Sequence, residues 1–458
     1  VFWQVFIVKV VKTLRHKITS HSNIFDDTLQ VYRQALTFVV EVMDREFPNL
    51  DGWNIKAMTQ AMEKLIHATQ KNPHPKYMDF DHLFYKFPSY FRRSAIAEAF
   101  GILKSHRSRY DKWLKEKEQA ERAGRRFKKK PPKLQFCHRA FPVFYKGVMF
   151  QRTGDTTAKI KVFHQKDWVW ITIRFKGQDL QKRGVVNWKE NNPSLVKVGK
   201  KYFLHISYQK SVDLNNTPLS QQKICAVDLG LNQSAVCSIM DANGTVFARK
   251  FINQAKEKDR LYRMTNKLKK AQRQSGYIKA PRYWRRINGL QKQIVNHTAH
   301  EIVRFAQDHG ADVIVFEYLD HMKMPKGFYG AKRLRFRLHY WRKQGIQQKV
   351  TEMAHCQGIR VARVNARNTS QLAFDGTGVV KRKGKKDVCQ FSSGKIYHAD
   401  LNATYNIGAR YFLRELRKST SEREWLSVEA KVPSLARRTQ QTLASLISFH
   451  QAMCQIGA

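Results

Sequence analysis

Three acidic residues of this chain could share one site. Asp228 ends the apolar segment 223–229, Glu317 ends the apolar run 311–317, and Asp400 opens the helical segment 398–409. Alone, an aspartate at a strand end or in a first helical turn is unremarkable. Together, three carboxylates would repel one another unless divalent cations lay between them. Mg²⁺ or Mn²⁺ suits such oxygen ligands, and two ions can clamp the attacking and leaving oxygens of a phosphodiester.

The elements around the acids predict how they would meet. The segment 223–251 predicts strands at 223–229, 234–240 and 245–251, because apolar and β-branched runs alternate with turn residues. Asn243-Gly244 predicts a type I′ turn, in which both central residues have positive φ. A helical pair, a strand at 311–317, a helix, a strand at 359–364 and a last helix follow. This is the element order of an α/β RNase H-like fold, whose parallel strands would bring the acids to one sheet edge.

Three motifs resemble those of a known family. The residues A-V-D-L-G-L-N at 226–232, I-V-F-E-Y-L at 314–319 and H-A-D-L-N-A-T-Y-N-I-G at 398–408 resemble the RuvC motifs of TnpB-type nucleases. Insertion sequences of transposons encode these nucleases, which are related to compact type V CRISPR effectors. T-S-Q at 369–371 adds to the resemblance, which covers most of the chain. It implies that Asp228, Glu317 and Asp400 are catalytic and hold Mg²⁺ or Mn²⁺ in a DNA-cleaving site.

Composition favours a polyanionic partner. The chain of 458 residues has 84 Lys and Arg against 36 Asp and Glu, a formal charge of +48. Such a charge attracts nucleic acid, although a ribosomal-type or merely soluble basic protein would share it. We expect no membrane partner, because no window is apolar enough to span a bilayer. The six cysteines lack pairing spacings, which favours a reducing cytoplasm. With the family resemblance, we expect a prokaryotic, nucleoid-associated protein.

The rest of the chain predicts a multidomain α+β protein. Period-two segments within 134–214 and near 6–11 predict a small β-barrel that a helical block interrupts. These parts resemble the wedge and recognition domains that hold a guide RNA and read a short flanking motif of double-stranded DNA. The expected domains are a wedge-like barrel at 1–22 and 121–222, a helical recognition domain at 23–120, a RuvC-like nuclease domain at 223–366 and 398–418, a degenerate zinc-ribbon-like insertion without metal at 367–397, and a loosely held C-terminal helical tail at 419–458.

Basic residues on helices and in the proline-broken segment 122–133 predict contacts with nucleic-acid backbone, against the alternative of an ordinary solvated face. Helices at 254–309 could line a channel for a guide–target heteroduplex. The segment 323–330 predicts a mobile loop over the acids. The candidate backbone contacts are Arg92, Arg93, Arg107, Lys128, Lys129, Lys130, Lys269, Lys270, Arg273, Arg285, Arg286 and Arg342.

The chain departs from the family at 367–397, where relatives carry a zinc ribbon with two cysteine pairs. Ala373, Gly376, Gln390 and Ser393 occupy the matching positions, and Cys389 stands alone. A structural zinc site needs four Cys or His ligands, so we expect no zinc. The insertion should be a metal-free hairpin around 374–391 with a turn at 375–378, and 381–386 could touch DNA. The apolar residues expected to hold it are Phe374, Val379, Val380, Val388, Phe391 and Ile396.

Three functions remain open. The sequence favours an RNA-guided DNA endonuclease that hydrolyses phosphodiesters. A guide-RNA-dependent DNA binder that does not cut is the second, since the zinc ligands are lost. An unguided RuvC-like nuclease or resolvase is the third, but it does not explain the large basic N-terminal half. Whether the protein is a monomer or a dimer stays open.

Overall fold

The computed structural model describes residues 7–20, 24–134, 140–275, 280–319, 331–382 and 387–457. The chain forms two compact units, one of residues 11–210 and one of residues 1–10 with 211–458. The loop expected at 323–330 and the residues 383–386 of the basic segment lie outside the described residues. No described helix is long and apolar enough to cross a membrane.

The unit of residues 11–210 joins helices to short strands around one core. Residues of α1 and α4 pack in this core with residues of the strands β3 and β4. Its elements are β1 (Ile7–Lys17), α1 (Ile24–Glu46), α2 (Ile55–Ile66), α3 (Asp79–Leu83), α4 (Ser89–Arg122), β2 (Phe150–Arg152), β3 (Thr157–His164), β4 (Asp167–Arg174), β5 (Lys189–Glu190), β6 (Ser194–Val198) and β7 (Lys201–Asp213).

The strands of this unit form two sheets. The strands β1, β7 and β5, with β6 beside β7, make one sheet, and β2, β3 and β4 make the other. A bridge between Ile18 and Phe175 links the end of β1 to the end of β4. At the other edge, the segment 143–146 forms bridges to Ser194 of β6 and to Phe150 of β2. The predicted strands are therefore present, and their closure into a barrel stays a prediction.

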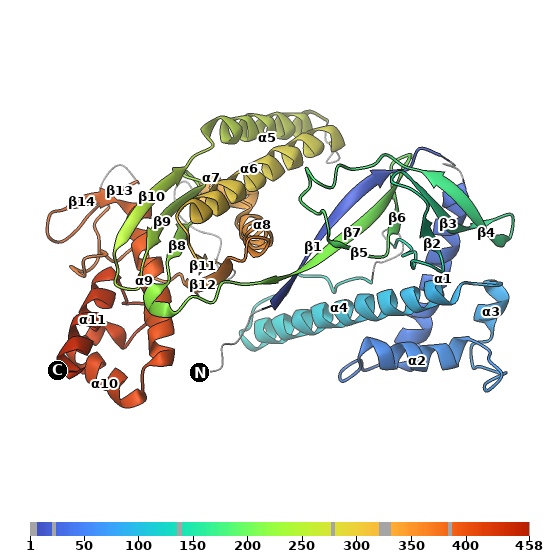
Figure 1. Ribbon diagram of the computed structural model, residues 1–458, viewed down its shortest axis with the longest axis horizontal. Coiled ribbons are helices and arrows are strands. Elements are labelled where there is room, and N and C mark those ends of the chain that lie inside the picture. Colours follow the sequence, from blue (N-terminus) through green and yellow to red (C-terminus); the bar gives the residue numbers. More distant parts are fainter. Residues whose placement is uncertain are drawn as a thin grey trace. The chain divides into compact units, whose positions relative to one another are not determined.

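The other unit is built on a five-stranded sheet of order β10-β9-β8-β11-β12 (Figure 1). The strands β8, β9 and β10 pair antiparallel, whereas β11 runs parallel to both β8 and β12. The elements are β8 (Ile224–Asp228), β9 (Ala235–Met240), β10 (Val246–Ile252), α5 (Ala255–Ser275), α6 (Pro281–Asp308), β11 (Val313–Tyr318), α7 (Ala331–Tyr340), α8 (Lys343–His355), β12 (Arg360–Asn365), β13 (Val388–Gln390), β14 (Ile396–His398), α9 (Ala399–Ser419), α10 (Glu422–Lys431) and α11 (Leu443–Gly457), with short 3₁₀ turns at Leu219–Gln221 and Pro433–Leu435.

Helices cover both faces of this sheet. Alternate residues of β8 and β11 pack with α9 on one face, and the residues between them pack with α6 and α8 on the other. Close approach of α9 requires Gly408, because a Cβ there would lie 1.9 Å from Sδ of Met240 on β9. The face that a residue occupies therefore decides whether it meets α9.

Two local expectations were wrong. Only Gly244 of the β9–β10 turn has positive φ, at 88°, so the turn is not type I′. Asp241 explains the difference, since its carboxylate accepts the amides of Asn243 and Thr245 and holds a longer loop. The residues 419–458 are not loosely held either, because Trp425, Leu446 and other side chains of α10 and α11 are buried in the core under α9.

Candidate functional site

Side-chain alternation directs two of the three predicted acids toward α9. Asp228 lies on the same face of β8 as Ile224 and Ala226, which pack in the core with α9. Glu317 lies on the same face of β11 as Val313 and Val315, which belong to that core too. Successive residues of a strand point to opposite faces, so both carboxylates face the helix that carries Asp400.

The strand register brings Asp228 and Glu317 side by side. Val227 pairs with Phe316 in the parallel β8–β11 ladder, so the residue after each occupies neighbouring positions. Neighbouring strands are about 4.8 Å apart, which is within reach of two carboxyl side chains on the same face.

Asp400 completes the group from the first turn of α9. A Cβ built on Gly230, two residues beyond β8, would lie 3.9 Å from Oδ2 of Asp400 and 2.9 Å from the carbonyl oxygen of Gln233. A larger residue at 230 would therefore collide with the turn that brings the end of β8 beside α9. All three acids line one cavity of about 1180 Å³.

Burial raises the pKa of each acid. The pKa of Asp228 lies well above its usual range because of burial first and then of the charges of Glu317 and Asp400. Burial also raises the pKa of Glu317, against the hydrogen bond from Thr369 and the charge of Arg410, which lower it. The pKa of Asp400 is raised chiefly by burial. No described residue forms an ion pair with any of the three, so direct pairing with a cationic side chain does not stabilise their ionised forms.

A polar ladder on α9 holds the segment that follows β12. Asn402 and Asn406 are fully buried, and both donate to the carbonyl oxygen of Leu372. Asn406 also donates to the carbonyl of Thr369, whose hydroxyl donates to Oε1 of Glu317. The ladder thus fixes the residue that orients a carboxylate of the site.

Arg410 extends this ladder by one more turn. Its guanidinium is 3 % exposed and donates to the carbonyls of Asn365, Arg367, Thr439 and Gln441. Burial lowers its pKa to about 10, against the effect of Glu317. Arg410 therefore joins the rim of the carboxylate cavity to the segment before α11.

The carboxylate oxygens of the three acids are suitable ligands for a divalent cation, but their arrangement does not form a complete ligand set. Oxygen donors and unneutralised charge are what Mg²⁺ or Mn²⁺ requires. However, no three Asp, Glu, His or Cys side chains within the described residues are arranged to hold one ion. The register makes Asp228 and Glu317 neighbours, so two of the three acids lie side by side on adjacent strands.

Some of the basic residues predicted to contact nucleic acid are engaged inside their own unit, and the others lie at half-exposed or exposed positions. Arg92 is 5 % exposed with Glu63 beside it, and Arg107 donates to Asp44 and to the carbonyl of Phe47, so both side chains are engaged inside their unit. Arg93 and Lys129 pair with Glu63 and Glu116 at half-exposed or exposed positions. The other exposed members are Lys128, Lys130, Lys269, Lys270, Arg273, Arg285, Arg286 and Arg342.

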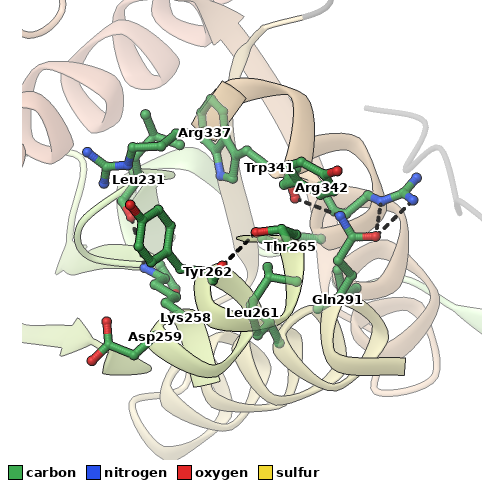
Figure 2. Close-up of a pocket in the computed structure, with 16 residues that line it drawn as sticks. Leu231, Lys258, Asp259, Leu261, Tyr262, Thr265, Gln291, Arg337, Trp341 and Arg342 are labelled. Atoms are coloured by element: carbon green, nitrogen blue, oxygen red, sulfur yellow. Dashed lines mark hydrogen bonds between the residues drawn. The ribbon is translucent and has the colours of Figure 1, made fainter. Parts of the chain in front are cut away.

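Arg342 lies at a second, smaller pocket, of about 440 Å³, next to the loop after β8. Its guanidinium points at Gln291 of α6, and Nε and Nη2 donate to the same amide oxygen (Figure 2). Opposite, Lys258 donates to the carbonyls of Leu231 and Asn232, and burial lowers its pKa to about 8. Lys258 therefore holds the loop that carries Gly230 against α5, whereas Arg342 joins the start of α8 to α6.

The insertion at 367–397 is a hairpin with an aromatic centre. The strands β13 and β14 pair antiparallel, and the expected turn at 375–378 is present, with positive φ at Gly376 and Gly378. Phe374 packs edge-on against Phe391 and Tyr397 at ring distances of 5.4 and 5.1 Å. The buried members of the cluster are Ala373, Val380, Cys389, Phe391 and Ala399.

Two residues predicted for the apolar centre of the insertion lie outside it. Val379 is 67 % and Ile396 69 % exposed, because alternate strand residues point to solvent. Ala373 and the isolated Cys389, by contrast, are both buried in the centre.

Sequence reasoning missed the residues that support the acids. Thr369 was noted only as part of T-S-Q, and Arg410 received no role. Arg382 lay within a basic segment, yet it lines the carboxylate cavity, and its charge lowers the pKa of Asp228 and Asp400. A mid-helix Asn402-Asn406-Arg410 spacing of four is the one signal that could have indicated the ladder.

The sheet and its acids define this unit as an α/β protein with a carboxylate-lined cavity under its last core helix. Residues 344–407, which include the insertion and Asp400, match the family described as Cas12f1-like, TNB domain. Residues 12–164 match the Aq_aa04 family.

A curated relative and several solved structures are similar to the chain. The TnpB-like protein aq_aa05 of Aquifex aeolicus (strain VF5) is 24% identical over 269 residues, which cover 53% of this chain and 85% of that protein. A Cas12f1-sgRNA-target DNA complex aligns with 87% of this chain and 98% of its own at 15% identity and a TM-score of 0.49. The mini-RNA-guided endonuclease CRISPR-Cas_phi3 aligns with 88% of this chain and 92% of its own at 11% identity and a TM-score of 0.45. The resemblance to TnpB-type proteins indicated by the three motifs is confirmed.

Proposed function

We propose that this protein is an RNA-guided DNA endonuclease. In this proposal, residues 223–366 and 398–418 form an RNase H-like, RuvC-type nuclease domain, and the N-terminal half holds the guide RNA and reads a short motif beside the target. The relation to TnpB and the net charge of +48 support it. The partners are then a guide RNA and double-stranded DNA.

The convergence of the acids carries the proposal. Asp228 and Glu317 are register neighbours on the face covered by α9, and Asp400 begins that helix. All three line one cavity and have raised pKa values. A structural role for the acids would favour ion pairs, and none is formed with a described residue.

Asp228, Glu317 and Asp400 would hold Mg²⁺ or Mn²⁺ once their carboxyl groups turn toward a common point. Bound cations would supply the activation of water and the stabilisation of attacking and leaving oxygens in phosphodiester hydrolysis. Thr369 would keep Glu317 oriented by its hydrogen bond, and Arg382 would offset part of the charge of Asp228 and Asp400.

A guide-RNA-dependent DNA binder that does not cut is the second candidate. It is favoured by the open arrangement of the acids in the described residues. It is opposed by the presence of all three carboxylates, which a pure binder does not need.

The test is replacement of each acid. We expect Asp228→Ala, Glu317→Ala and Asp400→Ala each to abolish Mg²⁺-dependent cutting of guide-matched DNA, with RNA and DNA affinity unchanged, because affinity comes from dispersed Lys and Arg. Asp259→Ala, at an exposed position of α5, is the control. RNA extracted from the purified wild type identifies the guide. The proposal is falsified if any of the three variants cuts like the wild type.

A further inference from the structure

A pocket lined by basic residues adjoins the carboxylate cavity. It has a volume of about 330 Å³ and lies between the end of β12, α9, α10 and the segment before α11. Its wall at Arg363, Val364 and Asn365 is also a wall of the carboxylate cavity. The two hollows are thus neighbours within one unit.

The charge of this pocket is strongly positive. Glu429 is the one carboxylate among the residues that line it, and its side chain accepts the indole N–H of Trp425. Outside the pocket, Glu415 pairs with Arg414 and Lys418, and Glu422 pairs with Arg417. Even with these two acids counted, cations outnumber carboxylates. The cations that line the pocket are Arg363, Arg410, Arg414, Arg417, Lys418 and Arg438.

The pocket is built by buried contacts. Arg410 lies at its base, and its donors bind backbone carbonyls on both sides, at Asn365 and Arg367 and at Thr439 and Gln441. Gln441 also donates to the carbonyl of Leu435, and Trp425 packs on Phe449 of α11 at 5.4 Å. These contacts place Arg438, which precedes α11, in the same pocket as Arg417 of α9 and the end of β12.

Because the cations outnumber the carboxylates, with Glu415 and Glu422 counted, the pocket keeps a net positive charge that favours an anion. A backbone phosphate fits this demand, since arginine forks match phosphate oxygens and the volume suits one phosphate with its sugar but not a duplex. The shared wall indicates that this phosphate belongs to the strand in the carboxylate cavity.

We propose that the pocket formed by α9, α10 and the segment before α11 binds a backbone phosphate of the DNA strand whose cleavage is proposed above. The inference rests on the proposed function for the identity of that strand. It gives residues 419–458 a role in positioning the strand, beside the acids, through contacts that read no sequence.

The test compares two adjacent arginines. Arg438 lines the pocket, whereas Arg437 is equally exposed and does not. Both are changed to Gln in a chain that also carries Asp228→Ala, so that cutting cannot interfere. Fluorescence anisotropy of the RNA-bound protein then follows a labelled 12-nucleotide dT strand as NaCl is raised.

We expect Arg438→Gln to weaken binding about two- to fivefold, the usual range for one exposed charge contact. The slope of log affinity against log salt should become shallower by about 0.7, the value for one single-strand phosphate. Arg438→Lys should restore most of the slope, and Arg437→Gln should leave both quantities near those of the parent. Equal behaviour of the two Gln variants would overturn the proposal.

Competitors identify what the pocket holds. Unlabelled dT strand should displace the labelled strand from the parent, whereas inorganic phosphate at the same phosphate concentration should not. If an rU strand displaces it from the parent at a lower concentration than dT does, and Arg438→Gln removes that preference, the pocket holds RNA and the inference is wrong. The assay measures binding without cleavage. A wild-type protein that does not cut DNA would therefore refute the proposed endonuclease activity but would not change the measured effect of Arg438→Gln.

Discussion

Asp228, which we propose as a metal ligand, is buried at a cost to the stability of the fold. Burial and the charges of Glu317 and Asp400 raise its pKa, so the protein favours the protonated form. The protonated form of Asp228 therefore contributes fully to folding stability below the ordinary aspartate pKa near 4. This contribution is lost as the pH rises through the raised pKa of the folded state. At neutral pH without a cation, an ionised Asp228 destabilises the folded state.

We therefore expect Asp228→Asn to raise the melting temperature in EDTA at pH 7.5 by a few degrees, since about 1 kcal/mol corresponds to roughly 2–4 °C in a protein of this size class. Mg²⁺ should raise the melting temperature of the wild type but not of Asp228→Asn. Differential scanning calorimetry measures both. A variant that melts below the wild type in EDTA would contradict the argument from repulsion.

Thr369 gives a second prediction at this scale. Its buried hydroxyl donates to Glu317, and a ligand freed from such a partner is held less well. Thr369→Val should cut about 10–100-fold more slowly and need more Mg²⁺ for half-maximal rate. Thr369→Ser keeps the hydroxyl and is the control. If the Thr369→Val and Thr369→Ser variants cut equally fast over a Mg²⁺ titration, the hydrogen bond from Thr369 does not orient Glu317.

At the scale of elements, the insertion shows how a hairpin can be built without four thiolates. Phe374 lies between Phe391, Tyr397 and Tyr405, with ring distances of 5.1–5.4 Å, and Lys395 lies over its face. Aromatic packing of this kind supplies apolar burial where a zinc ribbon relies on the metal.

The predicted absence of zinc is tested on the whole protein. Elemental analysis should find no stoichiometric zinc, and a zinc-selective chelator should leave the melting curve unchanged, because no metal contributes to folding. Phe374→Ala should destabilise the unit by about 2–3 kcal/mol, less than a fully buried phenylalanine. Ile396→Ala, at a 69 % exposed position, should change stability by under about 0.5 kcal/mol. One tightly bound zinc per chain would refute the prediction.

At the scale of the whole molecule, we expect the charge of +48 to govern the affinity for nucleic acid. Contacts to 6–10 phosphates cost roughly 10³–10⁵ in affinity between 50 and 200 mM salt. We expect a loss of at least about 10³ for target duplex, measured by filter binding. Changing the exposed Arg285 and Arg286 of α6 to Gln together should make the slope shallower. Affinity that hardly changes with salt would contradict the electrostatic argument.

The sequence by itself determined the candidate acids and the elements that carry them. Asp228 and Glu317 could be found because each lies at the end of an apolar run that marks a buried strand, which is a local property. The loss of zinc ligands at Ala373, Gly376, Gln390 and Ser393 was visible because the family resemblance gives the positions and the sequence gives the residues.

Only the tertiary structure decided the rest. The burial of Arg92, the division of the N-terminal strands into two sheets and the packing of α10 and α11 depend on contacts between segments far apart in sequence. Arg410 binds carbonyls about 30 and 45 residues away in opposite directions along the chain. Backbone carbonyls carry no residue-specific signal, so a side chain that binds them cannot be distinguished from a solvated arginine until the chain has folded.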